Sequence, residues 1–323
     1  MSMASKRATR TLVTGALGFV GRHLADRLVA RGDEVLLCDV IDPPELPSDR
    51  TYQRVDVTDR AALDAAVAGV EVVFHVASLV ATRQSHTARI WAVNQGGTRH
   101  VIEACRAAGV KRLVYVSSAS VVYEGRDIED GDEGLPYTRR SQAPYADSKV
   151  AAEKDVLAAH DATSLKTCAI RPHVVFGPGD GRFLPALIGR AKAGKLRMGV
   201  GRSERLSDFT YIDNLIDALV AADERLAVDP AVGGQAFFVT NGEPMPFWGF
   251  VDRFLVAMGK PETRGRVPYS VAYMAATVAE LFDALRGDVD RPESGLTRFA
   301  VRYMCTHHYF SIAKARRLLG YQP

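Results

Sequence analysis

Short apolar runs alternate with amphipathic stretches along the first half of the chain. Strands are predicted for the apolar runs at residues 11–13, 34–38, 52–55, 70–76, 112–116 and 167–170. Helices are predicted where apolar residues recur at helical spacing, at residues 20–31, 61–68, 94–108 and 145–160. Gly109 follows the third of these helices, at the position that favours left-handed backbone. Because the two patterns alternate and the strands are mostly apolar, we predict an α/β fold with a doubly wound parallel sheet covered on both faces.

The pattern changes after Pro172. Glycine and proline interrupt the chain at 177–179, and helices and short strands then mix less regularly. We therefore predict a sheet domain at residues 1–172 and a smaller mixed α/β region at 173–323, packed on the edge of the sheet, with some later strands and helices returning to the first domain. That second region is the place expected to hold a substrate.

Composition excludes several classes of protein. Lys and Arg number 41 against 38 Asp and Glu, a net charge of +3, and no basic cluster marks a face for nucleic acid. The N-terminus lacks the apolar segment of a signal peptide, and no apolar run reaches the ~18 residues of a spanning helix. These observations predict a cytoplasmic protein.

The cysteines do not form a recognisable metal or disulfide pattern. No two of them stand in a C-x-x-C pair, and only one has histidines close by in sequence, at His307 and His308. We therefore expect Cys38, Cys105, Cys168 and Cys305 to be reduced, mostly buried thiols that bind no metal.

Three glycines follow the first predicted strand and open the first predicted helix. Gly15, Gly18 and Gly21 permit a tight turn, close backbone approach to a diphosphate, and close packing of helix on strand. Asp39 ends the second strand, where a carboxylate accepts hydrogen bonds from a ribose 2′-hydroxyl and repels a 2′-phosphate. The pattern predicts a Rossmann-type dinucleotide site that favours NAD over NADP; the alternatives are a plain tight turn and an unliganded strand-end aspartate.

A second group of residues suggests proton transfer. Tyr145 and Lys149 stand at i and i+4 of a predicted helix, so they share one helix face. An ammonium group close to a phenol lowers the phenol pKa from its usual ~10, which makes the tyrosine a usable acid or base. Ser117 and Ser118 follow the strand at 112–116, at the sheet edge where ligands bind.

With these motifs, the chain resembles the extended short-chain dehydrogenase/reductase superfamily over nearly its whole length. The resemblance implies a hydride-transfer centre of Ser118, Tyr145 and Lys149, in which Tyr145 exchanges the proton and Asn94 supports the relay. It also implies an NAD site formed by Gly15, Leu17, Gly18, Phe19, Val20, Gly21, Asp39, Asp56, Val57, Ala77, Ser78, Tyr145, Lys149, Pro172 and Val175.

Longer segments resemble the 3β-hydroxysteroid dehydrogenase branch, in particular its decarboxylating members that act on sterol 4α-carboxylates. These segments lie at residues 117–125, 171–178, 208–214, 240–248 and 320–323. The resemblance implies NAD-dependent oxidation of a sterol 3β-hydroxyl; a 4α-carboxysterol would give a β-keto acid that loses CO₂. Candidate substrate residues are Arg83, Tyr123, His173 and Arg205. For each arginine a solvated surface position is the favoured alternative, and His173 could equally be a hydrogen-bonded core residue.

Alternatives remain open at this point. A general 3β-hydroxysteroid dehydrogenase and a long-chain β-keto acid reductase use the same centre, whereas a non-catalytic NAD-binding regulator would need no Tyr or Lys. Sugar-nucleotide epimerisation is disfavoured because the second region shows no obvious charged set for a diphosphate. The amphipathic stretch at 269–285 packs in the core, forms a lid, or makes peripheral contact with a membrane. By analogy with the superfamily, we expect a homodimer through the helices at 94–108 and 145–160.

Overall fold

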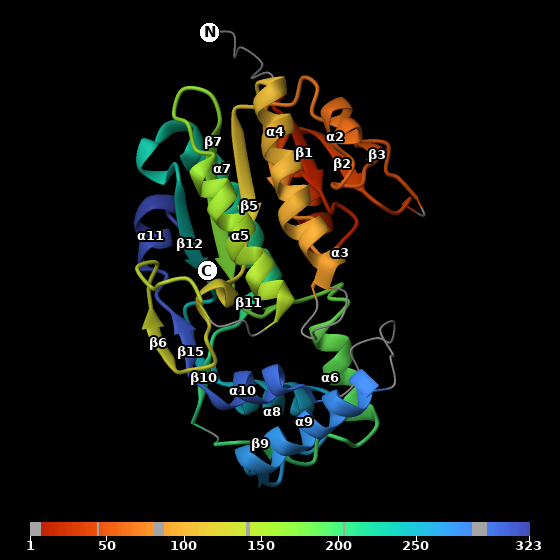
Figure 1. Ribbon diagram of the computed structural model, residues 1–323, viewed down its shortest axis with the longest axis vertical. Coiled ribbons are helices and arrows are strands. Elements are labelled where there is room, and N and C mark those ends of the chain that lie inside the picture. The colour runs from red at the N-terminus through yellow and green to blue at the C-terminus, as the bar shows by residue number, and fades with distance from the viewer. Residues whose placement is uncertain (1–7, 44, 81–86, 140–142, 203, 286–295) are drawn as a thin grey trace.

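The main sheet contains seven strands, all paired in parallel in the order β12-β7-β5-β4-β1-β2-β3. Figure 1 shows this computed structural model, which describes residues 8–43, 45–80, 87–139, 143–202, 204–285 and 296–323. The strands are β1 (Arg10–Thr14), β2 (Glu34–Asp39), β3 (Thr51–Arg54), β4 (Val72–His75), β5 (Arg112–Val116), β7 (Lys166–Pro172) and β12 (Gln235–Val239). Six of them lie at the predicted runs, and the seventh, β12, comes from beyond residue 172.

Helices cover both faces of this sheet. One face carries α1 (Phe19–Arg31), α7 (Ile212–Val228) and α11 (Ala313–Leu319), and the other carries α2 (Arg60–Ala66), α4 (Thr98–Ala108) and α5 (Pro144–Ala158). In Figure 1, α4 and α5 lie side by side in front of the sheet. The predicted doubly wound fold is therefore confirmed. The helix predicted to start at residue 94 begins instead with α3 (Thr87–Trp91) and a π-helix (Ala92–Gly97), and it ends at Gly109 with φ of 70°.

The strand residues alternate between two separate cores. Val13, Phe74 and Val114 point toward α1 and α7, whereas their neighbours Leu12 and Leu113 point toward α2 and α4. All five are fully buried, and each side chain contributes roughly 1.5–3 kcal/mol through burial. This alternation explains why the strands are apolar on both faces.

The second region is built from short elements around a smaller core. Helices α6 (Phe183–Lys192), α8 (Phe247–Ala257), α9 (Tyr269–Leu285) and α10 (Arg298–Cys305) lie below the main sheet in Figure 1. A four-stranded sheet of order β13-β10-β15-β6 contains β13 (Met245–Pro246), β10 (Leu206–Ser207), β15 (His308–Phe310) and β6 (Ile128–Gly131). Two strand pairs, β11–β8 and β14–β9, are formed by β11 (Thr210–Tyr211), β8 (Val175–Phe176), β14 (Arg266–Val267) and β9 (Gly199–Val200). Short 3₁₀ turns occur at Ala119–Val122 and Pro230–Val232. The chain thus crosses residue 172 in both directions: β6 joins the second region, and α7, β12 and α11 return to the first.

Among the described helices, none has the length and hydropathy needed to cross a bilayer.

All four cysteines are free; Cys38, Cys105 and Cys168 are buried and Cys305 is half-buried. Burial raises the pKa of each thiol, to about 12 for Cys38 and to about 11 for Cys305. These thiols therefore stay protonated and unreactive near neutral pH.

A buried ion pair joins α5 to β7. Arg171 Nη2 lies 2.6 Å from Glu153 Oε1, and the Tyr137 hydroxyl donates to the same oxygen over 2.8 Å. Glu153 is 0% and Arg171 3% exposed, so neither charge is solvated by water. Removing one partner would leave the other charge buried and uncompensated.

We predict that Glu153→Gln lowers the free energy of unfolding by about 3–5 kcal/mol. Urea denaturation at neutral pH measures this. The control is Glu103→Gln, whose exposed carboxylate pairs with Arg60 on the surface and should change stability by less than about 1 kcal/mol. Equal effects of the two substitutions would contradict the assignment.

Candidate active site

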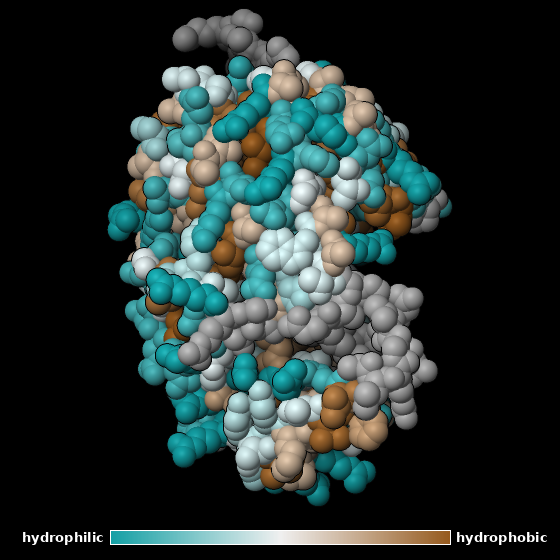
Figure 2. Space-filling model, in the orientation of Figure 1, coloured by the Kyte–Doolittle hydropathy of each residue, from teal (hydrophilic) through white to brown (hydrophobic). Residues whose placement is uncertain are grey.

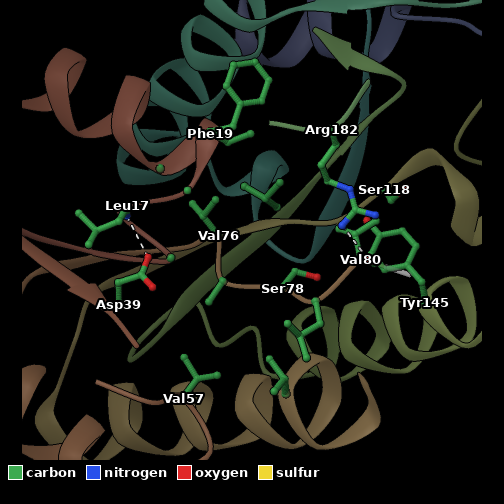
Figure 3. Close-up of a pocket in the computed structure, with 18 of the residues that line it drawn as sticks. Leu17, Phe19, Asp39, Val57, Val76, Ser78, Val80, Ser118, Tyr145 and Arg182 are labelled. Carbon is green, nitrogen blue, oxygen red and sulfur yellow. Dashed lines mark hydrogen bonds between the residues drawn. The ribbon is translucent and has the colours of Figure 1, made fainter. Parts of the chain in front are cut away.

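A cavity of about 840 Å³ opens at the carboxyl ends of β1, β2, β4, β5 and β7 (Figure 3). Ligands bind at this edge in doubly wound sheets. All residues predicted for the cofactor line it: Gly15, Leu17, Gly18, Phe19, Val20, Gly21, Asp39, Asp56, Val57, Ala77, Ser78, Tyr145, Lys149, Pro172 and Val175. The catalytic candidate Ser118 also lines the cavity, so the structure brings together residues from seven separate stretches of the chain.

The glycine loop has no room for side chains. Gly15 has φ of +66°, and a Cβ built there would lie 2.7 Å from the Ala77 Cα. A Cβ on Gly21 would lie 2.1 Å from the Gly15 carbonyl oxygen, so α1 packs directly on the loop. No side chain caps α1 at Gly18. The backbone N–H groups and the positive end of the helix dipole therefore face the cavity, which suits a diphosphate.

Two carboxylates, those of Asp39 and Asp56, line the same cavity. Asp39 accepts hydrogen bonds from Leu17 N at 2.9 Å and from Val40 N at 2.8 Å, as Figure 3 shows for Leu17. Asp56 accepts from both the backbone N–H and the hydroxyl of Thr58. The backbone therefore fixes both carboxylates in the cavity wall, with lone pairs left for the hydroxyls of a nucleoside.

A buried chain of hydrogen bonds holds the loop after β4 to the first strand. Thr98 donates its hydroxyl to the Asn94 carbonyl at 2.6 Å, so its oxygen must accept from His75 Nε2–H at 2.9 Å. His75 Nδ1 then accepts from the Thr14 hydroxyl at 2.7 Å, and the Thr14 oxygen accepts from the N–H groups of Val76 and Ala77. Burial lowers the pKa of His75 to about 3, so the ring stays neutral. Sequence reasoning did not assign this residue a role.

Asn94 lies behind the cavity and does not line it. Its side chain amide donates to the Leu79 carbonyl and the Ser148 hydroxyl, both at 2.9 Å, and its carbonyl accepts from Leu79 N at 2.8 Å. Ser78 also donates to it over 3.2 Å. Asn94 therefore positions the loop after β4 against α5, and its relay role stays a prediction.

Ser118, Tyr145 and Lys149 meet where β5 ends beside α5. Tyr145 is hydrogen-bonded to Ser118, and Lys149 Nζ donates to the Val116 carbonyl at 2.7 Å while lying 4.6 Å from the centre of the Tyr115 ring. Burial lowers the pKa of Lys149 to about 7. The ammonium is therefore held in place by one carbonyl and one aromatic face.

The expected lowering of the Tyr145 pKa is wrong for this structure. Burial raises the pKa of the phenol, because the phenolate is the charged form and loses solvation. The hydrogen bond with Ser118 and the positive charge of Arg182 act in the opposite direction but do not outweigh burial. The charge that acts on Tyr145 thus comes from Arg182 rather than from Lys149.

Arg182 is a cavity residue that sequence reasoning missed. In Figure 3 its guanidinium points toward Ser118 and Tyr145, and its Nη1 donates to the Val80 carbonyl at 2.7 Å. Asp180 sets the start of α6 by accepting from the N–H groups of Arg182 and Leu184. The glycine and proline turn at 177–179, which follows β8, was the only signal in the sequence that this loop reaches the sheet edge.

Three predicted substrate residues lie outside this cavity. Tyr123 is buried against Tyr303 and hydrogen-bonded to Thr306 at 2.7 Å. His173 is buried, with Nδ1–H donating to the Asp208 carbonyl at 2.8 Å and Nε2 accepting from the Tyr303 hydroxyl at 2.7 Å.

Arg205 forms an ion pair with Asp127 at 2.7 Å and lines a different cavity. Its place near the Asp208 motif in sequence does not bring it to Tyr145. Arg83 lies outside the described residues.

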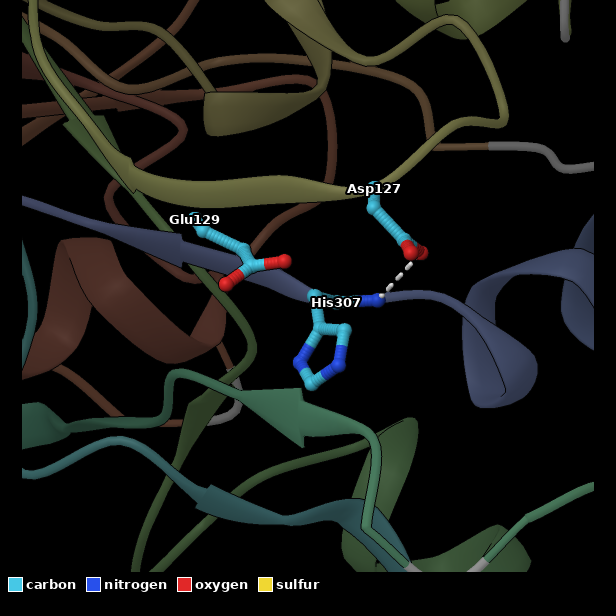
Figure 4. A group of neighbouring side chains, drawn as sticks. All are labelled: Asp127, Glu129 and His307. Atoms are coloured by element: carbon cyan, nitrogen blue, oxygen red, sulfur yellow. Dashed lines mark hydrogen bonds between the residues drawn. The ribbon is translucent and has the colours of Figure 1, made fainter.

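One cluster of side chains has a composition that suits a metal ion (Figure 4). Ligand atoms of Asp127, Glu129 and His307 lie within 4.8 Å of one another, although the carboxylates are far from His307 in sequence. Asp127 already accepts from Arg205 and from His307 N, and His307 Nδ1 accepts from Leu206 N at 3.2 Å. Asp127 and His307 are thus engaged within the protein, and their hydrogen bonds link the chain just before β6 to the chain just before β15.

The doubly wound sheet, the glycine loop and the Ser–Tyr–Lys set define a nicotinamide-dependent dehydrogenase of the short-chain type. Residues 12–268 match the 3-beta hydroxysteroid dehydrogenase/isomerase family, and the chain belongs to that family. The expectation of an NAD(P)-dependent dehydrogenase from the 3β-hydroxysteroid branch is confirmed.

Relatives with named activities cover nearly the whole chain. The sterol-4-alpha-carboxylate 3-dehydrogenase (decarboxylating) of Mus musculus is 37% identical and covers 98% of this chain and 87% of its own. The 2-alkyl-3-oxoalkanoate reductase of Stenotrophomonas maltophilia is 42% identical and covers 97% and 94%. The solved structure of MoeE5 with UDP-glucose and NAD has a TM-score of 0.71 at 25% identity, covering 97% and 92%.

We predict that Tyr145→Phe lowers kcat by at least about 100-fold, because the substitution removes the phenol hydroxyl that the site offers for proton exchange beside Ser118. Cofactor affinity, measured by NADH fluorescence titration, should change little. The matched control is Tyr309→Phe, which lies outside the catalytic cavity and should keep full activity. Undiminished turnover of Tyr145→Phe would exclude it as the proton carrier.

Proposed function

We propose that this protein uses NAD to oxidise the 3β-hydroxyl of a sterol that carries a carboxylate on the adjacent C4, with loss of CO₂ from the product. One observation carries the proposal: Ser118, Tyr145 and Lys149 share a single cavity with the glycine loop. The similarity to the Mus musculus enzyme supports the substrate class.

NAD is the cofactor, and its parts match the walls of the cavity. The loop at Gly15 and Gly18 suits the diphosphate, Asp39 suits the adenosine ribose, and Lys149 and Pro172 suit the nicotinamide half. Asp39 leaves a carboxylate where the 2′-phosphate of NADP would sit, which favours NAD. When bound, NAD accepts the hydride that leaves C3.

The protein's own residues manage the proton and the charge. Tyr145 takes the hydroxyl proton, and Ser118 orients both the phenol and the substrate oxygen by hydrogen bonds. The Arg182 guanidinium supplies the positive charge that favours the phenolate, and Lys149 lines the same cavity, where its ammonium suits the nicotinamide ribose. The product is a 3-keto-4-carboxylate. The bond between C4 and the carboxylate carbon then breaks, CO₂ leaves, and the electron pair forms the enolate of the 3-ketone, which takes up a proton at C4. No additional residue is required for that loss of CO₂.

Arg182 replaces Arg205 as the candidate partner for the substrate carboxylate. Its guanidinium lies beside Ser118 and Tyr145, where the reacting oxygen would bind, and arginine holds carboxylates through two parallel N–H bonds. The substrates named for the two relatives both carry a carboxylate close to the reacting carbon: one is a sterol 4-carboxylate that reacts at C3, and the other is a 3-oxo acid. A β-hydroxy or β-keto acid is thus the unit that this site would recognise.

An aromatic wall suits an apolar skeleton behind that unit. Phe183 lines the cavity, and its ring packs on Phe250 at 5.8 Å and on Phe209 at 6.5 Å between centroids. Such a wall accommodates a sterol or a long alkyl chain. The second candidate function, reduction of a long-chain β-keto acid, is favoured by the 42% identity to the Stenotrophomonas reductase. A general 3β-hydroxysteroid dehydrogenase remains the third candidate, and the complete Ser–Tyr–Lys set disfavours a non-catalytic regulator.

The test compares three substrates with the purified protein. A 4α-carboxysterol and the same sterol without the carboxylate are offered with NAD and with NADP, and a 2-alkyl-3-oxo acid is offered with NADH and NADPH. We expect NADH and CO₂ from the carboxysterol at a kcat/KM well above that of the plain sterol. Preference for the oxo acid would move the function to the second candidate, and equal use of both sterols to the third.

We further predict that Arg182→Gln lowers kcat/KM for the carboxylate substrate by about 10–100-fold, the worth of one charge-assisted hydrogen-bonded pair. Activity on a substrate without the carboxylate should fall by a smaller factor, because that substrate loses only the effect of the Arg182 charge on Tyr145. Arg190→Gln, on the same helix but outside the cavity, is the matched control. An equal loss on both substrates would make Arg182 a general catalytic or structural residue and would leave the proposed reaction standing.

We also propose peripheral membrane contact through α9. Its exposed side chains are large and apolar, with 51% of Val271, 62% of Met274 and 59% of Leu281 accessible. Figure 2 shows hydrophobic side chains gathered in the lower part of the molecule, where α9 lies in Figure 1. Such a face binds at the headgroup boundary of a bilayer.

We predict that the protein floats with phospholipid vesicles and that Met274→Glu/Leu281→Glu abolishes flotation without lowering dehydrogenase activity. A matched control, Arg253→Glu, changes the charge on neighbouring α8 and should float normally. Absence of the wild-type protein from the vesicle fraction would end this proposal.

We also propose a homodimer that forms through α4 and α5, supported by the adjacency of these helices. A cytoplasmic location is proposed as well, supported by the free thiols.

A further inference from the structure

A second cavity, of about 920 Å³, lies in the lower region and is rich in positive charge. Five arginines line it, whereas Asp127 is the sole acidic residue among its described lining positions. No described residue lines both this cavity and the catalytic one. The arginines come from four separate parts of the chain: Arg126, Arg202, Arg205, Arg266 and Arg302. This grouping is the charged set that the sequence did not reveal.

Two of the guanidinium groups are positioned mainly by neutral partners. Arg302 Nη2 donates to the Tyr273 hydroxyl at 2.7 Å, and its guanidinium lies 5.2 Å from the centre of that ring. Arg266 Nη1 donates to the Thr263 hydroxyl at 2.7 Å, and its guanidinium lies 5.7 Å from the Trp248 ring. These contacts fix the positions of the two guanidinium groups at the cavity.

The remaining partners neutralise little of the charge. Arg205 pairs with Asp127 at 2.7 Å, and Arg266 lies 3.8 Å from Asp252, beyond hydrogen-bond distance. Arg126 and Arg202 are exposed at the cavity and form no ion pair with any acidic residue that the structure describes. Like charges gathered in one cavity repel one another, and a bound anion relieves that repulsion.

We propose that this cavity binds a ligand through a phosphate or diphosphate group. Arginine forks match phosphate oxygens in pairs, and several of them are needed for a group that carries two or more negative charges. Tyr269, the first residue of the 17-residue helix α9, also lines the cavity, so the N-terminal end of a helix lies at this site. A single carboxylate would leave most of the positive charge uncompensated. The proposal does not depend on the substrate of the catalytic cavity.

Calorimetric titration with inorganic pyrophosphate tests the site. The protein is first saturated with NAD, so that the glycine loop is not available to the probe. We expect one pyrophosphate per chain, and at least tenfold weaker binding in Arg126→Gln/Arg202→Gln. The matched control, Arg197→Gln/Arg264→Gln, removes the same charge from exposed positions outside the cavity and should bind as the wild type does.

Three results would overturn the proposal: no binding heat in the NAD-saturated protein, equal weakening in both double variants, or binding of succinate as tight as that of pyrophosphate. NADH titration of each variant confirms that the fold and the first cavity are intact. Two sources could supply the phosphate, and vesicles distinguish them. If phosphatidic acid vesicles compete with pyrophosphate and phosphatidylcholine vesicles do not, a lipid headgroup is the source; if neither competes, the source is a soluble phosphate ester.

Discussion

The close approach of Gly15 to the loop after β4 is the constraint on which the catalytic cavity depends. A side chain at Gly15 would collide with the Ala77 backbone, so the glycine loop and the β4 loop can only meet with glycine at that position. The Thr14 hydroxyl oxygen also holds the loop after β4 against β1, because it accepts hydrogen bonds from the backbone N–H groups of Val76 and Ala77. Because His75 must donate to Thr98 to complete this chain, the position of the cofactor loop is tied to the start of α4.

Burial sets the electrostatics of the proton-transfer group. It raises the pKa of Tyr145 and lowers that of Lys149 to about 7, since both groups are pushed toward their neutral forms. The two pKa values therefore move apart: Lys149 gives up its proton at a lower pH than a free amine, and Tyr145 gives up its proton at a higher pH than a free phenol. Arg182 and the Ser118 hydrogen bond then favour the phenolate. A substrate carboxylate that paired with Arg182 would weaken its effect on Tyr145, so substrate binding and proton affinity are coupled in this site.

Most of the fold and of the cofactor side of the site could be predicted from the sequence, for a physical reason. Buried parallel strands are apolar over their whole length, and a diphosphate loop needs glycines at fixed spacing. Both signals are local. The substrate side could not be predicted in this way, because its residues come from irregular loops that long-range contacts place. Arg205 stands three residues before Asp208, yet its partner Asp127 belongs to a segment 78 residues away. Arg182 reaches Tyr145 only because the loop before α6 folds back over the sheet edge.

A stack of uncharged rings, formed by Tyr303, His173 and His308, separates the charged groups of the two cavities. Tyr303 on α10 stacks on His173 at 5.3 Å and on His308 at 4.0 Å between ring centroids. His173 follows Pro172 of the catalytic cavity, whereas Arg302 and Cys305 of the same α10 helix line the second cavity. Burial lowers the pKa of His308 to about 4 and that of His173 well below its usual value, so both rings stay uncharged near neutral pH. A charged histidine here would repel the neighbouring guanidinium groups. Because these rings are uncharged, the arginine-rich cavity can lie close to the catalytic cavity, in which Tyr145 must gain and lose a proton.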